Sequence, residues 1–183
     1  MKASPGSLKD VLLIEPTILG DARGYFVESW NARTFRDVTG LDVSFVQDNE
    51  ARSKRGVLRG LHYQVEQPQG KLVRVIRGEV FDACVDLRES SPTFGKWSGV
   101  ELSEENHLQL WVPPGFAHGY LVHSEYAIVL YKTTDFYAPA HERTILWNDP
   151  DIGIVWPIDG WRKPAVSAKD AAGLRFADAP KFS

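Results

Sequence analysis

The sequence predicts an all-β fold, an antiparallel jelly roll with a few short helices. Short apolar or alternating segments recur along the chain, separated by Gly, Pro, Asn or Asp at the spacing typical of sandwiches and barrels. Helical periodicity is sparse. Many short antiparallel strands must hide their edges, so two layered sheets or a closed barrel are the expected solutions, and we favour the jelly roll.

The strand pattern extends over most of the chain. We expect strands near residues 11–15, 24–30, 43–49, 57–63, 71–77, 79–87, 95–102, 108–113, 118–123 and 126–133.

Helical signals are confined to short segments. Asn31 is suited to cap a helix that runs through Asp37 and ends before Gly40. Ser167 is expected to start a second short turn, and a turn near residues 103–106 would join two strands. The segment after Pro157 is rich in Pro, Gly, Ala and Asp, and we expect it to pack as irregular structure over the rest.

Length, charge and cysteine content limit the class of protein. A chain of 183 residues suits a single domain over residues 1–183. The net charge of -3 gives no broad cationic field, so neither nucleic acid nor a membrane surface is an expected partner. Cys84 is the one cysteine, and residues 11–14 are too short an apolar run for a signal peptide. We therefore expect a cytoplasmic protein.

Residues 56–77 combine a histidine and a lysine in otherwise apolar strands. His62 lies in a glycine-flanked strand, and Lys71 opens the next strand. Removing a proton from carbon next to a carbonyl needs a base that is neutral near pH 7 and a cation for the resulting oxyanion. A hydrogen-bonded core histidine is the alternative interpretation. Arg59 can share a pocket with His62 only if Gly60 forms a bulge or the strand twists there, because an odd separation points two side chains to opposite faces.

His118 follows a Pro-Gly turn at the start of another strand. In metal-binding cupins such a turn carries one ligand, and an earlier hairpin supplies a His-x-His pair and a glutamate. Here residues 62–64 read His-Tyr-Gln, so two histidines and Glu66 make a poor ligand set for a transition metal. His118 is then either a donor to an anionic substrate group or a histidine of the turn.

Other candidate groups follow later in the chain. Tyr131 is either a buried phenol that needs a partner or an acid that returns a proton to the opposite face of a planar intermediate. Asp170 either caps a helix or orients His62 through its second ring nitrogen.

Some polar residues are suited to a nucleotide sugar. Arg23 has the forked guanidinium that binds phosphate oxygens, and Gln47 and Asn49 lie two apart, hence on one strand face. Singly, each is more typical of a solvated surface.

Taken together, the sequence closely resembles the dTDP-4-dehydrorhamnose 3,5-epimerase family. The matching segments cover nearly the whole chain in order: 20–26 (GDARGYF), 45–49 (FVQDN), 56–64 (GVLRGLHYQ), 69–75 (QGKLVRV), 91–97 (SPTFGKW), 114–120 (PGFAHGY), 131–134 (YKTT), 147–150 (WNDP) and 167–170 (SAKD). The resemblance implies a metal-free cupin jelly roll that is normally a homodimer, with no cofactor and with dTDP-4-dehydro-6-deoxyglucose as substrate.

The resemblance also implies a role for each site residue. The general base would be His62, oriented by Asp170, with Tyr131 as general acid and Lys71 at the enolate oxygen. The substrate-binding residues would be Arg23, Phe26, Glu28, Gln47, Asp48, Asn49, Arg59, His118, Tyr137, Glu142 and Lys169, and the Tyr137 ring would stack on thymine. The family builds its site partly from the neighbouring subunit's N-terminal strands, which would place Arg23, Phe26 and Glu28 in the partner's site, in trans. The sequence leaves the choice between cis and trans open.

Three rival functions remain at the level of sequence. One is an epimerase acting at a single carbon, or a ketoisomerase, on a related dTDP-deoxysugar. The others are a non-catalytic cupin that binds sugar nucleotides and a metal-dependent cupin oxygenase.

Overall fold

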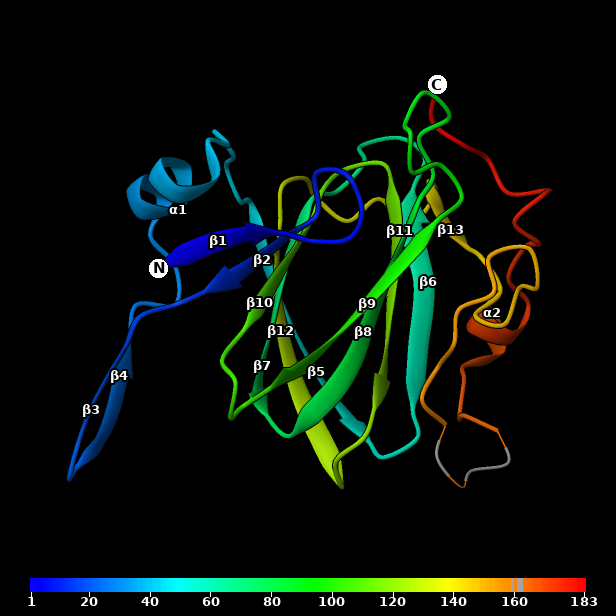
Figure 1. Cartoon of the computed structure of the whole chain (residues 1–183). Coiled ribbons are helices and arrows are strands. Elements are labelled where there is room, and N and C mark those ends of the chain that lie inside the picture. Colours follow the sequence, from blue (N-terminus) through cyan, green and yellow to red (C-terminus); the bar gives the residue numbers. More distant parts are fainter. Residues whose placement is uncertain (159, 161–162) are drawn as a thin grey trace.

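Two antiparallel sheets face each other in the computed structural model, which describes residues 1–158, 160 and 163–183 (Figure 1). The six-stranded sheet has the order β1 (Lys2–Pro5), β2 (Leu12–Glu15), β10 (Gln109–Val112), β7 (Lys71–Arg77), β12 (Tyr126–Thr133) and β5 (Gln47–Lys54). The five-stranded sheet has the order β13 (Glu142–Thr144), β6 (Leu58–Gln64), β11 (Phe116–Val122), β8 (Glu79–Asp86) and β9 (Trp97–Ser103). The predicted jelly roll is confirmed.

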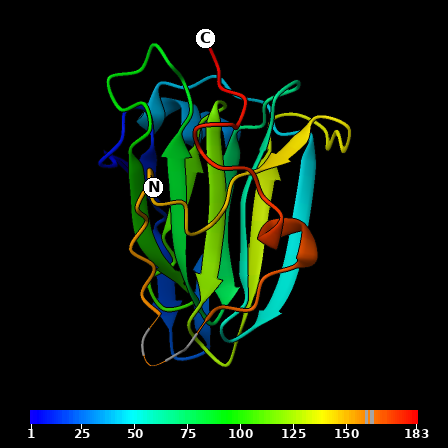
Figure 2. The ribbon, with the colours of Figure 1, turned by 90° about the vertical axis from the view of Figure 1, so that its right-hand side faces the viewer.

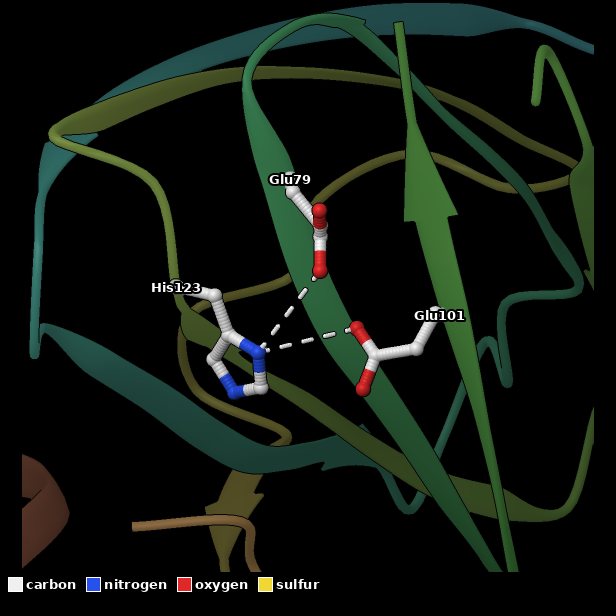
Figure 3. Close-up of side chains that lie close together, drawn as sticks. All are labelled: Glu79, Glu101 and His123. Atoms are coloured by element: carbon white, nitrogen blue, oxygen red, sulfur yellow. Dashed lines mark ion pairs between the residues drawn. The ribbon is translucent and has the colours of Figure 1, made fainter. Parts of the chain in front are cut away.

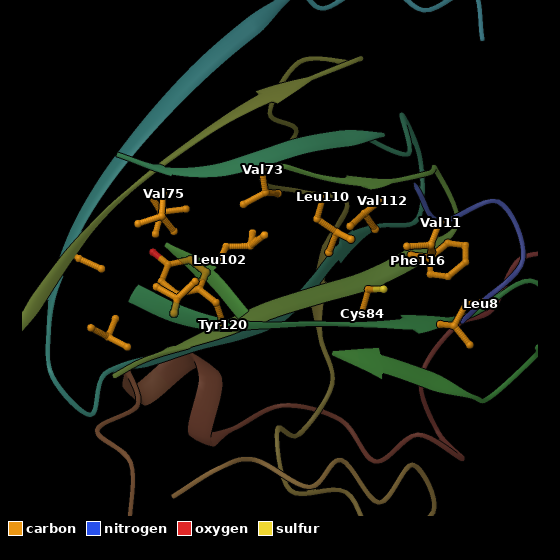
Figure 4. Packing of buried hydrophobic residues seen from close by; sticks show 14 residues of the cluster. Leu8, Val11, Val73, Val75, Cys84, Leu102, Leu110, Val112, Phe116 and Tyr120 are labelled. Atoms are coloured by element: carbon orange, nitrogen blue, oxygen red, sulfur yellow. The ribbon is translucent and has the colours of Figure 1, made fainter. Parts of the chain in front are cut away.

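The main core lies between the two sheets (Figure 4). Every second residue of a strand points inward, so Val73 and Val75 of β7 meet Leu102 of β9 and Phe116 of β11. Cys84 is buried in the same cluster, where burial raises the pKa of its thiol. The inward positions of the five-stranded sheet therefore fill the barrel, and its outward positions need another cover.

The C-terminal segment supplies that cover. Leu121 of β11 and Val85 of β8 point outward and belong to a second cluster with Ile145, Ile152 and Trp156. Figure 2 shows this segment and α2 (Ala168–Ala171) crossing in front of the strands. The expectation that the tail packs over the rest is confirmed for the described residues.

The two helices form where their capping residues predict. In α1 (Ala32–Thr39) the Asn31 side chain accepts hydrogen bonds from two backbone N–H groups, and Gly40 ends the helix with a φ of 73°. Phe35 of α1 packs against Trp111 on the outside of the six-stranded sheet. Ser167 caps α2. Neither helix among the described residues has the length and hydropathy that crossing a bilayer would need.

Some strand predictions were wrong in position. The strand expected at 43–49 is β5 at Gln47–Lys54, and β1, β13 and β3 (Ile18–Asp21) were not expected. The strand expected at 24–30 ends early, as β4 (Gly24–Val27), and pairs with β3 in a hairpin that projects from the barrel (Figure 1). The pattern of β5 misled because its inward positions are polar: they line a cavity instead of a hydrocarbon core.

Candidate active site

A cavity of about 340 Å³ lies between the two sheets. Both sheets contribute to its walls: β5, β7 and β12 on one side, and β6, β11 and β13 on the other. Its lining includes nine of the predicted site residues: Gln47, Asn49, Arg59, His62, Lys71, His118, Tyr131, Tyr137 and Glu142.

His62 and Asp170 form a close pair at the cavity wall. His62 Nε2 lies 2.6 Å from Asp170 Oδ1, and the His62 side chain is 27% exposed while that of Asp170 is 4% exposed. The Ser167 hydroxyl caps α2 by accepting from the Asp170 N–H, which leaves the carboxylate for His62. Although burial raises the Asp170 pKa, the hydrogen bond and charge of His62, together with the hydrogen bonds from Gly60 and Ser167, outweigh burial and lower the pKa. The expected contact is confirmed.

A bulge in β6 brings Arg59 to the same cavity. His62 pairs with His118, whereas Arg59 pairs with Tyr120. The two β6 residues are three positions apart and their β11 partners only two, so β6 contains one extra residue here, which is a bulge. Gly60 has a φ of 128°, and a Cβ atom there would lie 2.6 Å from the Gly119 Cα. Glycine is therefore required for the close approach of the strands. Of the two conditions that would let Arg59 and His62 share a pocket, a bulge or a twist at Gly60, the structure shows the bulge.

Lys71 places a cation beside His62. Its Nζ lies 3.5 Å from the His62 carbonyl oxygen. Burial lowers the pKa of Lys71 to about 8, although the negative charges of Glu142 and Asp82 partly oppose that shift. The amine is consequently still mostly protonated at pH 7, and it presents its charge to the cavity.

Tyr131 approaches the cavity from the opposite sheet. It lies on β12, whereas His62 lies on β6, so a molecule between the sheets would have one on each side. Burial raises the Tyr131 pKa, with Arg59 opposing the shift. The phenol is therefore held in its protonated form, the form that donates a proton.

Polar side chains are linked at the cavity rim. The Tyr137 hydroxyl donates to Glu142 Oε2 at 2.8 Å, and Lys169 forms an ion pair with the same carboxylate. Gln47 Oε1 accepts from the Tyr137 N–H at 3.1 Å, and its Nε2 donates to Asn49 Oδ1 at 2.9 Å. Burial raises the Glu142 pKa, but the hydrogen bonds from Lys169 and Tyr137 prevail and lower it.

His118 is held by a carboxylate that we did not predict. Its Nε2 lies 2.8 and 2.9 Å from the two oxygens of Asp82, and the Asp82 side chain is fully buried. The sequence carried one signal for this residue, an acid within the apolar run 80–87, because a buried charge needs a partner.

The family assignment comes from comparison of the whole chain. The family model described as dTDP-4-dehydrorhamnose 3,5-epimerase matches residues 5–178. The chain belongs to this family. An enzyme of that name from Pseudomonas aeruginosa is 59% identical over 182 residues, which are 100% of this chain and 99% of the relative. One from Shigella flexneri is 54% identical over 96% of each chain.

A solved epimerase structure is similar in fold. The crystal structure of dTDP-6-deoxy-D-glucose-3,5-epimerase from Legionella pneumophila, in complex with dTDP-4-keto-L-rhamnose, superposes with a TM-score of 0.94 at 47% identity. The match covers 98% of this chain and 94% of the Legionella chain.

Apart from Lys169 at the rim, four residues expected to bind substrate lie outside the cavity of this epimerase-family chain. Arg23 pairs with Asp21 on the projecting hairpin, Phe26 is 68% exposed, and Glu28 accepts from the Asn31 side chain. Asp48, also expected to bind substrate, alternates with Gln47 and Asn49, so it points away from the cavity and pairs with Lys132.

The ligand set considered for a metal does not converge in the cavity. Glu66 faces His141, with 3.6 Å between Oε2 and Nε2. Across the described residues, neither His62 nor His118 belongs to a group of three metal-ligating side chains.

Proposed function

We propose that this protein converts dTDP-4-dehydro-6-deoxy-D-glucose into dTDP-4-dehydro-L-rhamnose by inverting C3 and C5, a step of dTDP-L-rhamnose formation. Membership of the 3,5-epimerase family supports the reaction. The observation that carries the mechanism is the His62–Asp170 pair at the wall of a cavity that also holds the Lys71 amine.

The C4 ketone makes the hydrogens on C3 and C5 acidic. Because His62 Nε2 is engaged by Asp170, we assign Nδ1 as the nitrogen that takes the proton. Asp170 stabilises the resulting imidazolium. The electrons of the broken C–H bond form an enolate with its charge on O4, and the Lys71 ammonium stabilises this oxygen more than the neutral ketone.

Tyr131 supplies the second proton transfer. Its position on the sheet opposite His62 supports donation of its O–H proton to the other face of the enolate carbon. The carbon is thereby inverted. The imidazolium and the tyrosinate then return to their starting protonation states through solvent, and the same cycle serves the second carbon.

The rim residues are suited to the nucleotide part of the substrate. The Tyr137 ring is half exposed and held by Glu142 and Gln47, which supports stacking on the thymine. Arg59 and Lys169 supply positive charge for the diphosphate. Binding energy gained here positions the sugar between His62 and Tyr131.

We further propose a homodimer in which the β3–β4 hairpin of one subunit completes the cavity of the other. Among the described residues, the strands β3 and β4 pair only with each other, and an isolated two-stranded hairpin is barely stable in water. Leu19, Tyr25 and Phe26 are each more than 60% exposed on it. Arg23 and Phe26 would then act in trans. The cytoplasmic location stays a prediction from the sequence.

Isotope uptake from D₂O tests the reaction. Purified protein is incubated in D₂O with dTDP-4-dehydro-6-deoxyglucose, and the product is analysed by NMR and mass spectrometry. Deuterium at both C3 and C5 is expected. Label at a single carbon would replace the proposal with a single-carbon epimerase, and ligand binding without label would indicate a binding protein.

Co-expression of two inactive variants tests the shared site. Arg23→Ala and His62→Ala would each be inactive alone. A random mixture of subunits restores about one quarter of the activity if Arg23 acts in trans, because half of the dimers then carry one intact site. No recovery in mixed dimers, isolated with two different tags, would place Arg23 in cis.

A further inference from the structure

Three metal-ligating side chains converge away from the cavity. Glu79 comes from the start of β8, Glu101 from β9 and His123 from the residue after β11, and Figure 3 shows the three side chains pointing toward one another. His123 Nδ1 lies 3.9 Å from Glu79 Oε1 and 3.7 Å from Glu101 Oε2. One ligand atom from each residue falls within 4.8 Å of the other two.

The cluster occupies the outer face of the five-stranded sheet. The His123 N–H donates to the Glu79 carbonyl oxygen, and Glu101 pairs with Phe81 in the ladder. These positions alternate with the inward-pointing residues Val122, Val80 and Leu102 of the core. The cluster is therefore separate from the cavity that holds His62.

The two carboxylates lack a permanent cationic partner within the described part of the chain. Neither side chain accepts a hydrogen bond there, and the nearby Arg77 pairs with Glu104 instead. Two acids and an imidazole that face one another without hydrogen bonds form an arrangement that a bound cation would stabilise.

The distances suit a small divalent cation. Tetrahedral zinc with bonds of about 2.1 Å places its ligand atoms about 3.4 Å apart. The observed 3.7 and 3.9 Å are a few tenths longer. Both glutamates are about half exposed, so small side-chain movements can close the gap and the fourth position stays open to water.

The ligand types favour zinc over calcium or magnesium. Calcium and magnesium prefer oxygen ligands alone, whereas one imidazole with two carboxylates is a common zinc set. His123 Nε2 is buried without a hydrogen-bond partner among the described residues, so Nδ1 is the ring nitrogen available to a ligand.

We propose that Glu79, Glu101 and His123 bind one zinc-like divalent cation that joins β8, β9 and the end of β11. The ion stabilises the five-stranded sheet and takes no part in epimerisation, because its ligands lie on the face opposite the cavity. This proposal does not depend on the proposed function.

Zinc binding by matched variants tests the site. Untagged full-length protein, stripped with EDTA and returned to metal-free buffer, is titrated with ZnCl₂ by calorimetry and equilibrium dialysis. One equivalent per chain is expected. Glu101→Gln should weaken binding at least about tenfold, since loss of even an outer partner costs that much. His141→Gln should bind as the wild type does, because His141 faces a single glutamate.

Thermal unfolding with and without ZnCl₂ separates loss of the site from loss of the fold. Zinc should raise the Tm of the wild type and of His141→Gln by the same amount, and raise that of Glu101→Gln by clearly less. In EDTA, Glu101→Gln should be at least as stable as the wild type, because it removes a repelling carboxylate. Absence of one-equivalent binding, or an equal Tm rise in Glu101→Gln, would overturn the proposal.

Discussion

Two histidine–aspartate pairs stand on neighbouring strands of the same sheet, and their surroundings differ. His62 and His118 are direct partners in the β6–β11 ladder. The His62 side chain is 27% exposed, and its carboxylate partner Asp170 comes from α2. The His118 side chain is 8% exposed, and its partner Asp82 lies on the adjacent strand β8. Imidazole and carboxylate alone therefore do not identify a catalytic base.

The difference lies in what each ring can reach. His62 meets the cavity with one nitrogen held by Asp170, so its other nitrogen is available to a substrate. Both oxygens of Asp82 surround one nitrogen of His118 in a nearly dry site, which favours a fixed donor and a structural role for the acid. Variants of the two pairs test this distinction.

The largest expected effect is that of His62→Asn. We expect kcat to fall about 10³-fold or more, because the group that takes the proton is lost. Affinity for dTDP, measured by calorimetry, should change little. The matched variant His118→Asn should retain at least tenfold more activity than His62→Asn. Equal losses of kcat in the two variants would contradict the distinction between the two histidines.

Asp170→Asn should have the next largest effect on rate. The amide keeps the size of the side chain but no longer stabilises the imidazolium, so kcat should fall about 10²-fold. Asp82→Asn should instead lower the free energy of unfolding by about 1–3 kcal/mol, because a buried charge-assisted contact is lost. Steady-state kinetics and urea unfolding of both variants measure these effects. A loss of stability without a loss of rate in Asp170→Asn, together with the reverse in Asp82→Asn, would refute the assignment.

Tyr131→Phe should separate exchange from inversion. Without the phenol, His62 still removes and returns a proton on its own face, so deuterium exchange should persist while inverted product falls roughly tenfold to a hundredfold. Product analysis in D₂O measures both. Inverted product forming at the wild-type rate would remove Tyr131 from the mechanism.

The smallest expected effect is a shift in pH dependence. Since burial lowers the Lys71 pKa to about 8, kcat/KM should fall above pH 8 as the ammonium is lost, approaching tenfold per pH unit. The negative charge of Asp82 raises that pKa, so Asp82→Asn should move the alkaline limb to lower pH. A limb that stays in place, or moves upward, would argue against Lys71 as the group that titrates.

Sequence reasoning succeeded where the signal was local. The capping residues Asn31 and Ser167 gave both helices, and seven residues from Lys71 to Arg77 gave a strand with the predicted ends. The spacing of Arg59 and His62 set the condition under which the two could share a pocket, a bulge or a twist at Gly60, and the structure shows the bulge. In each case the physical cause lies within one turn of helix or a few residues of strand.

The sequence by itself determined the antiparallel jelly roll, its family and the set of polar residues available for catalysis. Only the tertiary structure decided which of them meet: Asp170 reaches His62 from 108 residues away, and Asp82 pairs with His118 across two strands. It also decided the burial that lowers the Lys71 pKa and the direction in which Asp48 points. Local periodicity records which face a residue occupies, whereas desolvation and long-range contacts arise only when distant faces come together.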